Sequence, residues 1–306
     1  NTAVGFSAGA TISSGVENIL IGAYAGDALT TGHYNVAIGM RALSAEDAHG
    51  YNIAIGRDAL KVQNAGANAY NVAIGYSAGV AVSTGVNNVA VGFQAGSAMS
   101  TGTYNTVLGA QAMSVGITTG DYNVAIGNAA GQVLTSGERN VLVGTAAGDA
   151  LTSGDYNVAV GHGALSAEDG HGYNTAIGYK TLNAQNAGTD AYNVAVGYEA
   201  GLNVSTGTTN TIIGATAGDA LTTGSNNVAI GYQALSTEDA HGRNVAIGKS
   251  ALFTQNAGAD AYNIAIGYNA GYAVSTGTQN TIMGGLAGDA LTTGSNNVAI
   301  GHGSLG

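Results

Sequence analysis

The chain contains no cysteine, proline or tryptophan, and only 8% of its 306 residues are charged. The lack of cysteine excludes disulfides, thiol catalysis and zinc-thiolate sites. Aromatic residues amount to 6%, and alanine and glycine supply much of the apolar content, which argues against a large conventional core. Disorder is also disfavoured, because it requires low hydrophobicity and high net charge, whereas the mean hydropathy is +0.15. These features together favour a narrow core of small side chains.

Basic residues are also scarce, with 7 Lys and Arg against 18 Asp and Glu and a net charge of −11. A negative surface argues against binding to nucleic acid or to anionic lipid. No apolar run approaches the roughly 18 residues that a membrane helix needs. We therefore expect no nucleic-acid partner and no membrane insertion, and no pattern in the sequence indicates a cofactor.

A block of Asn, three mostly apolar residues and Gly recurs eighteen times along the chain. The spacing of the repeat Asn is seventeen in most copies, as between Asn210 and Asn227, eighteen once and nineteen three times. We call the residues from one repeat Asn to the next a coil, and count positions from that Asn as position 0. The triplet is typically Val-Ala-Ile, as in Val36-Ala37-Ile38, and position 7 is Ala in sixteen copies.

The triplet between turn-forming residues predicts a short strand with β-branched side chains on one face and Ala on the other. Because both faces are apolar, we expect both to be covered. A repeat of this length leaves room for two or three short strands joined by tight turns, which is one coil of a parallel β-solenoid. We therefore predict an all-β protein, with coils of seventeen to nineteen residues. Residues 1–306 are expected to form a single β-solenoid of eighteen repeats, as a segment of a longer fibre.

Two coil types occur along the chain, and they differ at positions 8 and 11. Where position 8 is Gly, position 11 is apolar, as in the pair Gly218 and Leu221. Where position 8 is Leu, position 11 is polar, as in Leu235 and Glu238. We interpret this exchange as two ways of filling one core volume, with Glu238 pointing to water. The three longest coils carry an insertion beginning Gln-Asn-Ala-Gly, which we expect to bulge from one side as a loop.

The strings Asn227-Val228-Ala229-Ile230-Gly231 and Thr222-Thr223-Gly224-Ser225-Asn226 resemble the head repeats of YadA-like trimeric autotransporter adhesins and the repeats of phage tail fibres. The resemblance covers essentially the whole chain. It implies a left-handed parallel β-roll in which three identical chains wind about a common axis. The coils of the adhesin heads are shorter than those of this chain.

The repeat Asn and the Gly at position 4 form two columns that we interpret as structural. The Asn column predicts an internal amide ladder, with Asn also tolerating a left-handed turn conformation. The Gly column predicts positive φ or close backbone approach. The clearest members of the two columns are Asn18, Asn35, Asn71, Asn140, Asn157, Asn210, Asn227, Gly22, Gly39, Gly75, Gly144, Gly161, Gly214 and Gly231.

The motif Glu-Asp-x-His occurs three times and is the best candidate for a metal site. Carboxylates and an imidazole could hold a divalent cation. Consecutive carboxylates in a turn are usually solvated, however, and we prefer that interpretation, so no metal is predicted. The candidate ligands in the second copy are Glu168, Asp169 and His171.

Nine tyrosines immediately precede a repeat Asn, and they include Tyr34, Tyr51, Tyr156 and Tyr192. Exposed tyrosines could contact a glycan by stacking on sugar rings. We prefer the alternative that the rings pack along the rim with wetted hydroxyl groups.

No set of nucleophile, base and orienting residue recurs, so we predict that the chain is not an enzyme. The predicted function is that of a structural or adhesive fibre segment, located extracellularly on a cell surface or virion. Its expected partners are further copies of itself, as a homotrimer that can stack end to end, and a cell-surface glycan or protein receptor. The alternative function is that of a self-assembling filament or coat protein with a purely structural role.

Overall fold

The computed structural model describes residues 1–306 and divides into two compact units, Asn1–Asp155 and Tyr156–Gly306. Each unit is a parallel β-solenoid with one short strand per coil. The strands of the first unit are β1 (Thr2–Val4), β2 (Ile19–Ile21), β3 (Val36–Ile38), β4 (Ile53–Ile55), β5 (Val72–Ile74), β6 (Val89–Val91), β7 (Thr106–Leu108), β8 (Val124–Ile126) and β9 (Val141–Val143). The strands of the second unit are β10 (Val158–Val160), β11 (Thr175–Ile177), β12 (Val194–Val196), β13 (Thr211–Ile213), β14 (Val228–Ile230), β15 (Val245–Ile247), β16 (Ile264–Ile266), β17 (Thr281–Met283) and β18 (Val298–Ile300).

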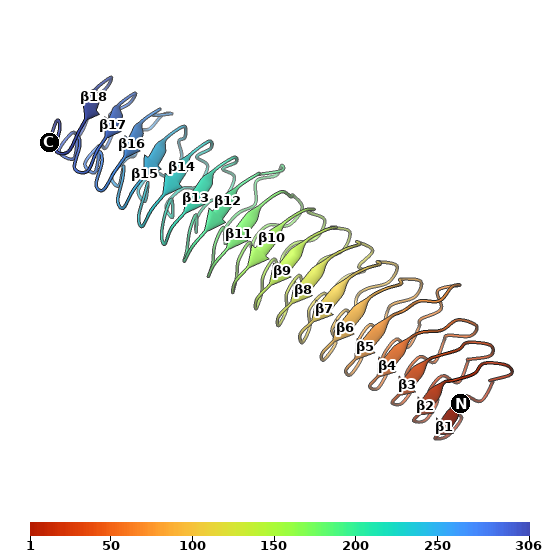
Figure 1. The fold of residues 1–306 in the computed structure, drawn as a ribbon. Helices are drawn as coiled ribbons and strands as arrows, with labels where there is room; N and C mark the ends of the chain where they lie inside the picture. The colour runs from red at the N-terminus through yellow and green to blue at the C-terminus, as the bar shows by residue number, and fades with distance from the viewer. The chain divides into compact units, whose positions relative to one another are not determined.

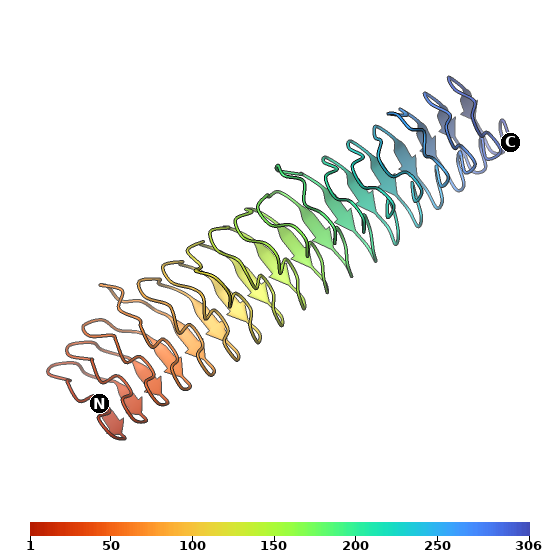
Figure 2. The ribbon, with the colours of Figure 1, turned by 180° about the vertical axis from the view of Figure 1, so that it is seen from behind.

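Within each unit, every strand pairs in parallel with the strand of the next coil, so the strands lie side by side in sequence order (Figures 1 and 2). The register is the same throughout: Val36 pairs with Ile53, Ala37 with Ala54 and so on. The predicted all-β, parallel solenoid with one coil per repeat is therefore confirmed.

The expectation of two or three strands per coil is wrong, because only the triplet after the repeat Asn is a strand. The rest of each coil consists of turns, and backbone bonds still join these turns from coil to coil. Gly26 N, for example, donates to Ala42 O at 2.9 Å, and Ser83 N donates to Ser100 O at 2.9 Å. The turns satisfy backbone groups between coils without the extended geometry of a strand.

The core is a column of small side chains that lies behind the strands. The middle residue of each strand after β1 is buried, as Ala37 and Ala229 are, and Ala at position 7 joins it. Position 2 is itself sometimes large, as in Leu142 and Ile212, which are fully buried. In both of those coils position 8 is Gly, so positions 2, 8 and 11 together share the core volume.

The structure supports the interpretation that positions 8 and 11 share one core volume, but it corrects the expected position of the polar residue at position 11. A Cβ placed on Gly218 would lie 2.9 Å from the Leu221 Cδ1 atom, so the two positions do compete for the same space. The expectation that Glu238 points to water is wrong, because its side chain is fully buried. Polar residues at position 11 are buried in all six coils concerned, namely Glu46, Gln63, Glu168, Gln185, Glu238 and Gln255.

The insertions of the three longest coils lie at the surface. Gly66, Gly188 and Gly258 have no atom of another residue near the place where a Cβ would stand, and residues 66–68 are exposed. Each insertion is tied to the preceding coil by a bond from a backbone N–H. Gly50 N donates to Asn68 Oδ1, and Gly242 N donates to Asp260 Oδ1, both at 3.1 Å.

Candidate functional site

The repeat Asn side chains form a continuous amide ladder inside each unit. The backbone N–H of Asn227 donates to Asn210 Oδ1 at 2.9 Å, and Asn210 Nδ2 donates to Gly224 O at 2.9 Å. The buried amide of Asn210 thus satisfies one backbone group of its own coil and one of the next coil. The Asn itself does not adopt positive φ. The residue before it does, as in Tyr34 at +58° and Arg243 at +64°. The sequence does not predict a positive φ at this position, because Tyr and Arg seldom adopt one.

The Gly column at position 4 stacks Gly on Gly. Gly214 has φ +133°, and a Cβ there would lie 2.5 Å from the carbonyl oxygen of Gly231. Both expectations for this column, positive φ and close backbone approach, therefore apply at the same residue.

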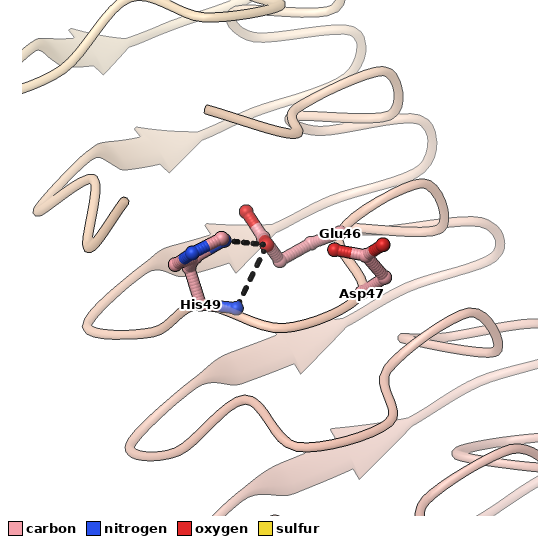
Figure 3. A group of neighbouring side chains, drawn as sticks. All are labelled: Glu46, Asp47 and His49. Atoms are coloured by element: carbon pink, nitrogen blue, oxygen red, sulfur yellow. Dashed lines mark hydrogen bonds and ion pairs between the residues drawn. The ribbon is translucent and has the colours of Figure 1, made fainter. Parts of the chain in front are cut away.

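The glutamates of the three Glu-Asp-x-His turns are buried, which contradicts the preferred interpretation of a solvated turn for that residue, whereas the adjacent aspartates are exposed. The Glu46 side chain has no exposed surface, whereas His49 is about a quarter exposed. Glu46 Oε1 accepts a hydrogen bond from the His49 backbone N at 3.0 Å and lies 3.5 Å from His49 Nδ1 (Figure 3). The same arrangement recurs at Glu168 and His171, with distances of 3.1 and 3.5 Å.

Each of the three turns contains a triplet of Glu, Asp and His, and one potential metal-ligand atom from each of the three residues lies within 4.8 Å of the other two. The triplets are Glu46, Asp47 and His49; Glu168, Asp169 and His171; and Glu238, Asp239 and His241. The glutamate in each triplet is buried, the aspartate is exposed and the histidine is intermediate.

Burial raises the pKa of these glutamates because it disfavours the charged carboxylate. The pKa of Glu46 and of Glu168 lies above the ordinary value of 4.5, and that of Glu238 is raised to about 6. In each case the backbone N–H and the imidazole of the histidine three residues later lower the pKa but do not cancel the effect of burial.

The tyrosines before the repeat Asn form stacks. The rings of Tyr34 and Tyr51 are 4.9 Å apart with an interplanar angle of 25°, and those of Tyr51 and Tyr70 are 5.0 Å apart. Tyr156 and Tyr192 stack in the same way on either side of Tyr173, at 5.2 and 5.0 Å. Within a stack the ring faces contact each other, so the side of the row presents ring edges and hydroxyl groups rather than faces on which a sugar could stack.

The outward face of each sheet is apolar. At the first and third positions of every strand stands Val, Ile, Leu, Met or Thr, and no charged residue occurs there. These side chains are partly or fully exposed, with Ile19, Ile213 and Ile264 at 42%, 38% and 38%. We call these first and third strand positions the outward sheet face. The expectation that both strand faces are covered is thus met on the core side only, within a single chain.

No protein-family model, curated protein or solved structure matches the chain. The structure has no pocket of ligand size. It also contains no helix with the length and apolar character needed to cross a bilayer.

Proposed function

We propose that the chain is a structural and adhesive segment of an extracellular fibre, in which identical chains associate as a homotrimer through the outward sheet face. The observation that carries the proposal is the absence of any charged residue from that face. Parallel sheets are normally covered on both sides, and contiguous exposed apolar surface marks an interaction site.

A further copy of the chain is the partner that fits this face best. The rows of Val and Ile repeat once per strand spacing, which is about 4.8 Å in a sheet. Only a partner surface with the same spacing between side chains can match these rows over many coils, and a second copy of the chain necessarily has that spacing. The number of three copies follows from the resemblance to trimeric adhesin heads.

The adhesive part of the proposal concerns the tyrosine rows. Tyr34 is 45% exposed and Tyr192 is 54% exposed. Their hydroxyl groups can donate and accept hydrogen bonds with the hydroxyls of a cell-surface glycan or with a protein receptor. Because the ring faces are engaged, we propose contact through hydroxyl groups along the row, at Tyr34, Tyr51, Tyr156 and Tyr192.

The test is to place charge on the outward sheet face. We expect the double variant Ile213→Lys and Ile264→Lys to convert a trimer to monomers, because burying two unpaired ammonium groups per chain is costly. Thr237→Lys is the matched control, since it adds a positive charge at an exposed turn position. Light scattering after gel filtration measures the mass.

A trimer that survives both lysines would contradict the use of this face. Assemblies of wild-type chain much larger than a trimer would favour the alternative, a self-assembling filament or coat.

A further inference from the structure

Buried polar atoms without a hydrogen-bond partner are concentrated at the three Glu-Asp-x-His turns. Of fifteen such side-chain atoms in the structure, eleven belong to these turns or to the amides beside them. They include the second carboxylate oxygen, Oε2, of Glu46, Glu168 and Glu238, and the Nδ1 atom of His49, His171 and His241. Because buried polar groups are nearly always satisfied, a group that recurs unsatisfied at equivalent places requires an explanation.

We propose that each of the three turns binds a first-row divalent cation such as Zn²⁺, with the glutamate carboxylate and histidine Nδ1 as ligands and the aspartate completing the protein side. An imidazole nitrogen with carboxylate oxygens is a ligand set that suits zinc, copper or nickel rather than calcium or magnesium. The site requires neither the trimer nor the fibre function.

The separation of the donor atoms fits a shared ion. Zinc bonds to nitrogen and oxygen are about 2.0–2.2 Å long, so two ligands at a tetrahedral angle stand about 3.4 Å apart. The histidine Nδ1 atom lies 3.5, 3.5 and 3.8 Å from glutamate Oε1 in the three copies. Those distances are long for a hydrogen bond, but they match two ligands of one metal ion.

The glutamate can bind a metal without losing its bond to the backbone. Oε1 of Glu46 already accepts the His49 N–H, while Oε2 has no partner. Figure 3 shows the carboxylate of Glu46 beside the His49 ring, with both drawn interactions ending on the same oxygen atom. A carboxylate offers about four lone-pair sites, so Oε1 can keep its bond to the His49 N–H and bind the ion as well, with Oε2 available as a second ligand atom.

The neighbouring amides are not ligands. Asn52 Oδ1 accepts Asn71 N at 3.2 Å, and Gln63 Oε1 accepts Asn71 Nδ2 at 2.7 Å. Their amide oxygens are therefore engaged, and only N–H donors remain unpartnered. This restricts the protein ligands to the three residues of the motif, with solvent able to reach the exposed aspartate side.

The test uses the fact that three of the six histidines lie in the motifs and three do not. The full chain, freed of metal with a chelator that is then removed, is titrated calorimetrically with Zn²⁺. We expect three ions per chain. The cluster variant, His49→Ala with His171→Ala and His241→Ala, should bind none, and the matched control, His33→Ala with His162→Ala and His302→Ala, should still bind three.

A second variant leaves the histidines in place and replaces the three glutamates, so that loss of a ligand can be separated from loss of the fold. Glu46→Gln with Glu168→Gln and Glu238→Gln places in each site the residue that the following coil already buries at position 11. It should melt as a folded protein and bind Zn²⁺ at least about tenfold more weakly. Zn²⁺ should also raise the melting temperature of the wild type and of the histidine control, but not that of the cluster variant.

No saturable Zn²⁺ binding by the wild type would overturn the proposal, and so would equal binding by the cluster variant. The first result would leave a plain Glu–His ion pair across the turn, and the second would place the ions elsewhere on the acidic surface.

Discussion

Gly214 and Gly258 both have positive φ, at +133° and +71°, but their surroundings differ. A Cβ on Gly214 would meet the Gly231 carbonyl oxygen at 2.5 Å, whereas nothing lies within 4 Å of the same position on Gly258. We expect Gly214→Ala to lower the free energy of unfolding by at least about 3 kcal/mol, since backbone strain and a backbone clash add. Gly258→Ala should cost only about 1 kcal/mol, for the left-handed conformation alone.

Denaturant unfolding of the two alanine variants measures this difference. Equal losses would mean that the Gly column reflects φ alone and that the coils are not held at the close spacing described above.

The buried Glu238 gives a second prediction at this scale, about pH. Its pKa in the folded chain is raised to about 6 from an ordinary 4.5, first by burial and to a lesser degree by Asp239, with His241 acting in the opposite direction. A raised pKa for an acid means that its contribution to stability is complete below about pH 4.5 and is lost as the pH rises through 6. The ionised form above pH 6 is then the unfavourable one to bury.

We therefore expect Glu238→Gln to be more stable than the wild type at pH 8, by about 2 kcal/mol for a shift of this size, and to show no such gain at pH 4. Both proteins are unfolded by denaturant in the presence of chelator, so that no bound metal contributes. A gain of the same size at both pH values would contradict the buried, destabilised carboxylate.

These residue-scale features were only partly predictable. The Asn and Gly columns follow from the sequence, because a regular spacing of an amide and a glycine has few other physical uses. The burial of Glu238 does not, because a charged residue in a turn is normally solvated. Its depth depends on the bond that Glu238 Oε1 accepts from the His241 N–H at 3.2 Å, which is a matter of turn geometry and not of composition.

At the scale of the single coil, the two coil types make a quantitative prediction. In the coil of Asn210, Leu221→Glu should remove a buried Leu and bury a charge, at a cost of at least about 3 kcal/mol. Adding Gly218→Leu should recover part of that loss, because the new Leu enters the volume that Leu221 leaves. The recovery should be incomplete, because Ile212 is buried at position 2, where the coil of Leu235 has Ala229. The backbone at position 218 already has the conformation that a Leu adopts at position 8, since φ is +50° at Gly218 and +53° at Leu235.

Thermal and denaturant melts of the two single variants and of the double variant measure the coupling. The expected coupling exceeds the roughly 0.5 kcal/mol seen for independent sites. A double variant as unstable as the sum of the single variants would show that positions 8 and 11 do not share one core volume.

The coil was predictable in outline and not in detail. The period and the inward Ala of strands such as β14 follow from the repeated triplet. The absence of further strands does not, because the turn segments between Gly231 and Asn244 carry apolar residues that also suit a strand. Frequent residues with positive φ, among them Gln233 at +55° and Leu235 at +53°, interrupt any extended segment there. A positive φ is uncommon for non-glycine residues, so their identity does not predict it.

At the scale of the whole molecule, the same outward sheet face appears in both units, and the sequence places all of its charged residues elsewhere. A chain with few large core residues gains from covering this face, since apolar surface removed from water contributes about 25 cal/mol per Å². The Glu-Asp-x-His turns and the inserted loops lie outside the strands, so association through the face leaves the three proposed metal sites and the tyrosine rows to be tested separately.

Sedimentation equilibrium of the wild-type chain tests the central claim, that identical chains cover one another's outward sheet faces. We predict a species of three times the chain mass of 29.9 kDa, with a melting temperature that rises with protein concentration because folding and association are linked. A single species of 29.9 kDa that stays monomeric and folded, with a melting temperature independent of concentration, would contradict it.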